Sequence, residues 1–116
     1  MSGRHVIPVT DATFDAEVLQ SPLPTLVDFT AAWCGPCRVI APHVAAVAEA
    51  NAGQLKVAVL DVDENIAVAT RFLVRSMPTL LLFQGGKVVG QIVGAVPRSK
   101  IEALVAQVLP AHGAVA

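Results

Sequence analysis

Cys34 and Cys37 are the residues of this chain whose type and spacing point most directly to chemistry. They are its only cysteines, and two residues separate them. Side chains three positions apart on a helix lie about 5–6 Å apart at Cβ, and a disulfide needs Cα atoms about 4.4–6.8 Å apart. The two thiols can therefore form and break a disulfide without a change of fold, which is what thiol–disulfide exchange requires.

A structural disulfide and a metal site are the alternatives to redox chemistry. A disulfide stabilises mainly by restricting the unfolded chain, and this effect grows with the length of the closed loop. A bridge over so short a loop would restrict the chain very little. A Cys-x-x-Cys pair is also half of a zinc site, and the missing ligands could come only from His5, His43 and His112. Redox chemistry is the favoured interpretation.

Composition indicates one compact domain over the 116 residues, of which 54% are hydrophobic. Eight basic and nine acidic residues nearly balance, so there is no electrostatic basis for binding nucleic acid or an anionic membrane. No apolar run approaches the roughly 20 residues of a membrane-spanning helix. Residues 1–10 lack the apolar core of a signal peptide. We expect a cytoplasmic location, where thiols are kept reduced and a lone cysteine pair favours catalysis.

Strand-like and helix-like segments alternate along the chain. Gly85-Gly86 predicts a tight turn that joins the last two strands into an antiparallel hairpin. The pattern predicts an α/β fold, with a mixed sheet covered by helices on both faces and a mobile tail at 110–116. The strands are expected at 5–9, 25–30, 55–61, 79–84 and 87–93, and the helices at about 10–20, 34–50, 65–72 and 98–109.

Local signals set the expected helix ends. Thr10 or Asp11 can cap the first helix, because both side chains accept backbone N–H bonds. Ser99 and Glu102 fit a capping box in the last helix, whereas Pro97 suits its first position.

Cys34 is expected where a strand ends and a helix begins. Free backbone N–H groups and the positive end of the helix dipole stabilise an anion there, so the pKa of this thiol should be lowered. As a thiolate, Cys34 would attack a substrate disulfide. Cys37, expected to be more buried and to hold its proton longer, would then attack Cys34 and release the reduced substrate.

The residues between and before the cysteines have expected supporting roles. Gly35 lets another backbone approach closely. Pro36 falls in the first helical turn, where its missing N–H matters little, and it stiffens the loop and tunes the redox balance. Trp33, the only tryptophan, is expected to cover the site, with simple core packing as the alternative.

Asp28 and Pro78 are the two other unusual positions. Asp28 interrupts an apolar strand, where an isolated carboxylate tends to stay protonated. It could exchange a proton with Cys37, or be a core aspartate bonded to backbone or hydroxyl groups such as that of Thr30. Pro78 precedes a strand, where a trans proline is ordinary and a cis bond is the minority case.

Five segments together resemble the landmarks of the thioredoxin family, in order, within about residues 5–109. The resemblance implies a thioredoxin fold, with a five-stranded mixed sheet flanked by four helices in a single domain over residues 1–116. The matching segments are Leu26-Val27-Asp28-Phe29, Ala32-Trp33-Cys34-Gly35-Pro36-Cys37, Ile40-Ala41-Pro42, Ser76-Met77-Pro78-Thr79-Leu80 and Val93-Gly94-Ala95.

The resemblance also implies residue roles. Cys34 would be the nucleophile, Cys37 the resolving thiol and Asp28 the proton carrier. Pro78 would be a cis proline that faces the dithiol. A flat, mostly apolar surface would dock substrates, formed by Trp33, Gly35, Pro36, Met77, Pro78, Gly94 and Ala95.

Two positions depart from the family pattern. Thr30 stands where many members have Trp, so the pocket beside the dithiol should be smaller or more polar. Val59 stands where many have a Lys close to the buried aspartate. We therefore expect Asp28 to lack a cationic neighbour and to have a raised pKa.

A general protein-disulfide reductase, carrying electrons in cell redox homeostasis, is the favoured function. The resemblance implies a monomer recharged by an NADPH-dependent flavoprotein, thioredoxin reductase. The chain has no nucleotide-binding loop, so we expect it to hold no cofactor. The alternatives are a disulfide oxidase or isomerase, which usually has His in place of Pro36, and a binding module in which the thiols are incidental.

Overall fold

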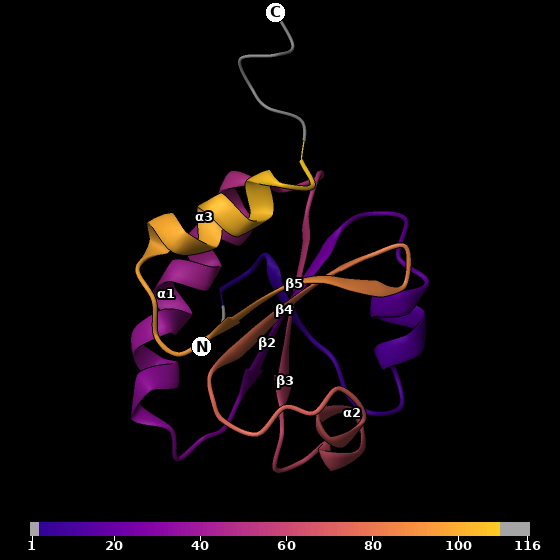
Figure 1. The fold of residues 1–116 in the computed structure, drawn as a ribbon, viewed down its shortest axis with the longest axis vertical. Helices are drawn as coiled ribbons and strands as arrows, with labels where there is room; N and C mark the ends of the chain where they lie inside the picture. Colours follow the sequence, from indigo (N-terminus) through magenta and orange to yellow (C-terminus); the bar gives the residue numbers. More distant parts are fainter. Residues whose placement is uncertain (1–2, 110–116) are drawn as a thin grey trace, which may run out of the picture.

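The computed structural model describes residues 3–109 and places a five-stranded sheet at the centre of the chain (Figure 1). The expected tail at 110–116 lies outside the described residues. The strand order is β1-β3-β2-β4-β5. The strands are β1 (Val6–Pro8), β2 (Thr25–Thr30), β3 (Lys56–Asp61), β4 (Thr79–Gln84) and β5 (Lys87–Val93).

The direction of the strands brings distant segments to one edge of the sheet. Strands β1, β3 and β2 are parallel, whereas β4 runs antiparallel to β2 and β5 antiparallel to β4. The carboxyl ends of β2 and β3 therefore meet the start of β4 and the end of β5. Gly85 and Gly86 have φ of +60° and +79°, the left-handed conformations that a two-residue hairpin turn requires.

Helices cover both faces of the sheet. The face that carries Leu26, Leu80 and Leu82 packs against α1 (Gly35–Ala50) and α3 (Arg98–Ala106). The opposite face, with Val27, Leu81 and Phe83, packs against η1 (Asp15–Leu19) and α2 (Ile66–Arg71). Because side chains alternate along a strand, adjacent residues of β2 and β4 serve two separate cores. These observations confirm the predicted α/β fold, a mixed sheet flanked by four helices.

The start of the first helix differs from the prediction. Residues 11–13 form a turn, and the helical segment η1 begins only at Asp15. Thr10 does accept a bond from the backbone N–H of Thr13, at 3.2 Å. Asp11, however, caps a different helix. Its two carboxylate oxygens accept the N–H groups of Ala67 and Val68 in α2, at 3.1 and 2.9 Å.

The capping box expected in α3 is also wrong. The N-cap of α3 is Pro97, and no side chain bonds to this helix end. Glu102 instead accepts a hydrogen bond from the Arg98 guanidinium, at 2.8 Å. The helix ends at Ala106, three residues before its expected end. An ion pair one turn apart competes with a capping box for the same glutamate.

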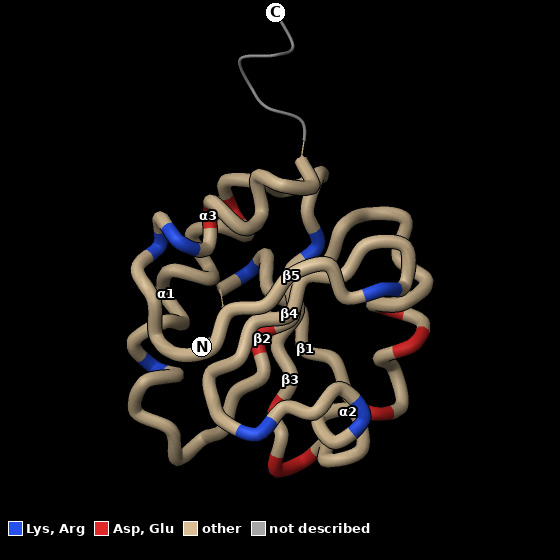
Figure 2. The backbone as a smooth tube through the Cα atoms, viewed as in Figure 1, with Lys and Arg blue, Asp and Glu red and all other residues tan. Residues whose placement is uncertain are grey.

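Charged residues lie at the surface around the edge where the carboxyl ends of β2 and β3 meet. Asp61, Asp63 and Glu64 end β3 and follow it, and Figure 2 shows acidic segments in this connection. The loop that leads from α2 to β4 carries one basic residue, Arg75, and Figure 2 shows a basic segment on this loop. Within residues 3–109, no helix has the length and apolar character needed to cross a membrane.

Candidate active site

Cys34 lies at the point where β2 gives way to α1. It is the N-cap residue of α1, with an extended backbone at φ −92° and ψ 110°. Its N–H donates to the carbonyl of Ala31 at 3.1 Å. Pro36 occupies the first turn of the helix, where its fixed φ is compatible with helical geometry and no N–H is needed. The sequence therefore predicted the local structure around this cysteine correctly.

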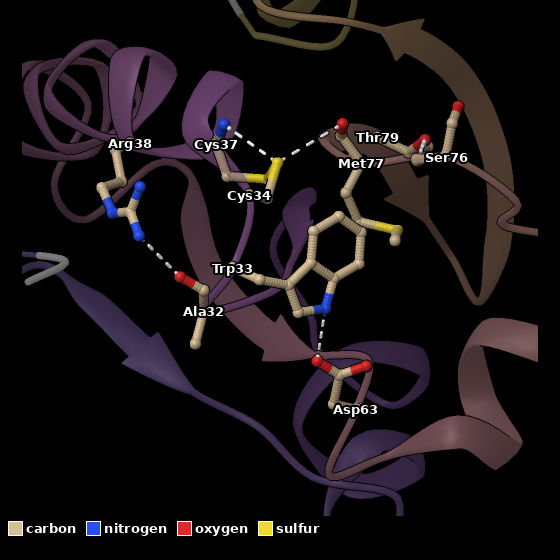
Figure 3. Close-up of a disulfide and its surroundings, with 9 residues drawn as sticks. All are labelled: Ala32, Trp33, Cys34, Cys37, Arg38, Asp63, Ser76, Met77 and Thr79. Atoms are coloured by element: carbon tan, nitrogen blue, oxygen red, sulfur yellow. Dashed lines mark hydrogen bonds between the residues drawn. A yellow bond between two sulfur atoms is a disulfide. The ribbon is translucent and has the colours of Figure 1, made fainter.

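The two sulfur atoms are joined in a disulfide, and the Cα atoms of Cys34 and Cys37 are 5.3 Å apart (Figure 3). The N–H of Cys37 donates to Sγ of Cys34 at 3.2 Å. This donor is one of the free N–H groups of the helix start, where the helix dipole also favours negative charge. The arrangement is suited to holding a thiolate at Cys34 when the disulfide is reduced.

Burial does not distinguish the two cysteines. Each is only 3% exposed, so the expectation that Cys37 is the more buried is wrong. Both belong to the same core cluster as Val68 and Ala69 of α2. The N–H donor and the helix start at Cys34 still distinguish it from Cys37.

The loop before β4 faces the disulfide. The Met77–Pro78 peptide bond is cis, as the resemblance implied. Sγ of Cys34 lies 3.5 Å from the carbonyl oxygen of Met77. The N–H of Gly94 donates to the carbonyl of Pro78 at 2.9 Å, so the end of β5 is tied to the same loop.

Trp33 lies on the surface beside the disulfide rather than in the core. Its side chain is 66% exposed, and its indole N–H donates to Oδ2 of Asp63 at 2.8 Å (Figure 3). Core packing of this residue is therefore wrong. The sequence did not identify Asp63 as its partner, because the contact joins loops thirty residues apart and neither residue type marks such a pair.

The seven residues expected to dock substrates differ in exposure. Trp33, Gly35, Pro36 and Ala95 are exposed, Met77 and Gly94 are half-buried, and Pro78 is buried. Hydrogen bonds and close contacts link three of the segments that carry them, at Cys34, Met77–Pro78 and Gly94. The structure thus brings these segments together around the disulfide.

Asp28 is buried in the middle of β2. It is 4% exposed, and its Oδ1 has no hydrogen-bond partner in the part of the chain that the structure describes. The hydrogen bond considered between Asp28 and the Thr30 hydroxyl does not form at this oxygen. Val59 lies opposite Asp28 on β3, so the nearest strand supplies no cation. Burial raises the pKa of Asp28 to about 7, in the expected direction.

A cavity of about 220 Å³ connects this carboxylate with the dithiol. Asp28 and Cys37 both line it, and so do Thr30, Arg38 and Asp61. The cavity is large enough for several waters, since one water occupies about 30 Å³ in the liquid. Thr30, Arg38 and Asp61 give it polar groups beside the dithiol.

Comparison with known proteins gives a consistent result. The family model described as Thioredoxin matches residues 5–107. Thioredoxin 1 of Nostoc sp. is 50% identical over 93 residues, which cover 80% of this chain and 87% of that protein. The thioredoxin of Streptomyces clavuligerus is 52% identical over 93 residues, covering 80% and 86%. The bifunctional thioredoxin reductase/thioredoxin of Mycobacterium leprae is 49% identical over 104 residues, covering 90% of this chain and 23% of that protein.

These likenesses agree with the geometry of the site. A Cys-Gly-Pro-Cys segment begins a helix, its sulfurs are bonded, and a cis Met77–Pro78 bond lies in the loop whose Met77 carbonyl contacts Cys34. The chain belongs to the thioredoxin family and is a thiol–disulfide oxidoreductase that acts on protein disulfides.

Proposed function

We propose that this protein is a general protein-disulfide reductase in which Cys34 is the nucleophile. The observation that carries the proposal is the position of Sγ of Cys34, which accepts the Cys37 N–H at the start of α1. The Cys34 thiolate attacks one sulfur of a substrate disulfide and forms a mixed disulfide. The other substrate sulfur leaves as a thiolate and takes a proton from solvent.

Cys37 completes the exchange. Its thiolate attacks Sγ of Cys34, the mixed disulfide breaks, and the substrate leaves with its second thiol reduced. The protein then holds the Cys34–Cys37 disulfide, so two electrons have passed to the substrate. The 5.3 Å separation of the two Cα atoms supports this step, because the bridge closes without moving the backbone.

Asp28 is the proposed carrier of the Cys37 proton. The thiol of Cys37 must lose its proton before it attacks, and the cavity of about 220 Å³ offers a path through water to the Asp28 carboxylate. A pKa near 7 suits the exchange of a proton near neutral pH.

The proposed docking surface is made of the seven residues Trp33, Gly35, Pro36, Met77, Pro78, Gly94 and Ala95, and Gly35 and Pro36 also tune the redox balance. The proposed electron donor is an NADPH-dependent flavoprotein thioredoxin reductase. One relative supports this, because the name of the Mycobacterium leprae protein joins a thioredoxin reductase and a thioredoxin. We further propose a monomer with a single domain over residues 1–116 that acts in the cytoplasm.

Insulin reduction tests the central proposal. The parent protein, with NADPH and a thioredoxin reductase, should reduce the insulin disulfides. Cys34→Ser should abolish turnover, whereas Cys37→Ser should accumulate the mixed disulfide, visible as a covalent adduct by mass spectrometry. If Cys34→Ser still turned over, or if Cys37→Ser trapped nothing, Cys34 would not be the nucleophile.

A separate experiment tests Asp28. Asp28→Asn keeps the shape of the side chain but cannot take a proton. The mixed disulfide should decay about 10²-fold more slowly at neutral pH, the usual magnitude for loss of a general base. Stopped-flow measurement of its lifetime provides the readout. An unchanged lifetime would remove Asp28 from the mechanism and leave the role of Cys34 intact.

A further inference from the structure

Leu73 has a conformation that bulky side chains rarely adopt. Its φ is +59°, and it is the one non-glycine residue with positive φ among residues 3–109. Left-handed backbone conformation costs about 1–2 kcal/mol for residues other than glycine. Its side chain is 71% exposed, so contacts within the described chain offset little of this conformational cost.

The local fold fixes the backbone at this point. The N–H of Leu73 bonds to the carbonyl of Thr70 at 3.1 Å, and the N–H of Val74 bonds to the carbonyl of Ala69 at 2.8 Å. These two bonds form a Schellman motif at the end of α2, and the left-handed position of that motif is usually glycine. The backbone here is therefore imposed by the helix end, while the choice of leucine is not.

A small cavity begins beside this side chain. It has a volume of about 200 Å³ and lies between the loop that precedes β4 and the end of β5. Its apolar walls include Leu73 and the exposed Val93, while Arg75, Ser76 and Gln91 contribute polar atoms. Small-molecule sites usually have about 300–1,000 Å³, so this cavity suits a single side chain better than a cofactor.

The positive charge of Arg75 beside the cavity indicates which kind of side chain of a bound partner would fit there. Arg75 is exposed and lines the cavity. Among residues 3–109 it forms no ion pair, whereas Arg71 pairs with Asp15 and Arg98 with Glu102. An unpaired guanidinium next to the exposed apolar side chains of Leu73 and Val93 is complementary to a bulky apolar side chain that has a carboxylate beside it.

The cavity lies next to the loop that contacts the dithiol. Ser76 lines it and directly precedes Met77, whose carbonyl oxygen lies 3.5 Å from Sγ of Cys34. Figure 3 shows the Met77 carbonyl oxygen directed at Sγ of Cys34, with Ser76 farther from the disulfide. The Met77 carbonyl oxygen lies 3.5 Å from the sulfur, and one Cα step of about 3.8 Å separates Met77 from Ser76, so the cavity wall at Ser76 lies within about 10 Å of the sulfur along this path. An extended chain covers this distance in about two to three residues.

We propose that Leu73, Val93 and Arg75 form a specificity subsite for the substrate polypeptide. The subsite takes a bulky apolar side chain, flanked by Asp or Glu, at two or three residues from the substrate cysteine that Cys34 attacks. Strained backbone is often retained where it serves binding, and Leu73 is the strained residue of this loop. This inference rests on the proposed function, because it concerns the substrates of the same dithiol.

Disulfide-linked peptides that differ at one position test the subsite. One peptide carries Leu three residues from the cysteine and the other carries Ala there, each with an Asp neighbour. The parent protein should reduce the Leu peptide with about tenfold higher kcat/KM. Equal values for the two peptides would overturn the proposal.

Leu73→Gly and Leu73→Asn identify the residue responsible, since both residues tolerate positive φ. Each variant should lower the preference for Leu from about tenfold to about twofold, through KM rather than kcat. Val88→Ala is the matched control, because Val88 is also exposed on the surface but lies at the opposite end of β5. A preference unchanged in both Leu73 variants, or lost equally in Val88→Ala, would contradict the assignment.

Arg75→Gln tests the charge. The parent should prefer the Asp-bearing Leu peptide over the same peptide with Lys by about fivefold at low salt, and Arg75→Gln should remove most of this preference. Added salt should also reduce it in the parent, because exposed charges are screened. No charge preference in the parent would overturn the acidic part of the proposal.

A small disulfide separates the subsite from the underlying function. Hydroxyethyl disulfide has no polypeptide to occupy the cavity, so the parent, both Leu73 variants and Arg75→Gln should reduce it at equal rates. If the parent failed to reduce it at all, the proposed reductase function would fail. If the parent succeeded and the peptide preferences were absent, only the subsite would be wrong.

Discussion

Asp28, in the strand β2, and Asp11, in the turn that follows β1, are two aspartates with opposite environments in the fold. Asp28 is 4% exposed, with one carboxylate oxygen that lacks a partner within the described chain. Asp11 is exposed, and both of its oxygens accept backbone N–H groups of α2. The negative charge of Asp11 is stabilised by these two N–H groups, whereas the unpartnered oxygen of Asp28 has no such donor.

The difference separates chemistry from stability in this molecule. Burial of a carboxylate with an unpartnered oxygen destabilises the folded protein when the group is ionised, so the reaction proposed for Asp28 explains its presence. Asp11 contacts no part of the dithiol site and satisfies two N–H groups that the short helix α2 cannot satisfy itself. Removing either carboxyl group should therefore change stability in opposite directions.

The largest expected effect is the pH dependence of stability that Asp28 causes. Its pKa is 3.8 when unfolded and about 7 when folded. Between these values the folded protein keeps a proton that the unfolded chain has lost, so stability falls as pH rises. At 1.36 kcal/mol per pKa unit, the loss is on the order of 4 kcal/mol by pH 8.

Urea unfolding at a series of pH values measures this loss. Relative to Asp28→Asn, the parent should lose stability steadily from about pH 4 to pH 7 and then level off. The free energies of unfolding should be compared as differences at each pH, because other titrating groups cancel in the difference. A difference that stays constant across this range would mean that Asp28 is not destabilised by burial.

The next effect is the loss of the cap that Asp11 provides. Asp11→Ala should lower the free energy of unfolding by about 1–2 kcal/mol, since it leaves two N–H groups of α2 without partners and removes a charge that favours the helix dipole. Thermal or urea unfolding measures the change.

Asp15→Ala is the matched control for this prediction. Asp15 is also an exposed aspartate that contacts α2, but it does so through an ion pair with Arg71 at 3.0 Å. Exposed ion pairs contribute about 0–1 kcal/mol. If both variants lost the same small amount, the cap at Asp11 would contribute no more than a surface charge.

These two aspartates also show what the sequence could predict. Asp28 was recognisable because a single carboxylate interrupted an apolar strand, and its environment follows from that strand alone. The partner of Asp11 was not recognisable. A capping residue usually acts on the helix that follows it directly, and here the chain returns to that residue more than fifty positions later.

The same distinction holds for the rest of the site. Strands 25–30, 79–84 and 87–93 and the start of α1 follow from local apolar patterns, Gly85-Gly86 and Pro36, and they agree with the structure. The contact of Trp33 with Asp63 and the strained Leu73 depend on how loops meet. No local pattern in the sequence specifies contacts between loops that are distant along the chain.

The smallest expected effect is the change in stability on replacing Leu73. It tests whether Leu73, like Asp28, lowers the stability of the folded protein and is kept for function. Leu73→Gly relieves a left-handed conformation that costs about 1–2 kcal/mol. Glycine also gives the unfolded chain more conformational freedom, which lowers the free energy of unfolding by about 0.4–1 kcal/mol. The side chain is 71% exposed, so little burial is lost. The variant should be more stable than the parent by about 0.5–1 kcal/mol, measured by urea unfolding. Asp28→Asn and Leu73→Gly should both stabilise the protein near pH 8, while each weakens a different step of substrate reduction. If Leu73→Gly were instead less stable than the parent, leucine at this position would support the fold. Asp28 would then be the only one of the two residues that lowers stability in favour of function.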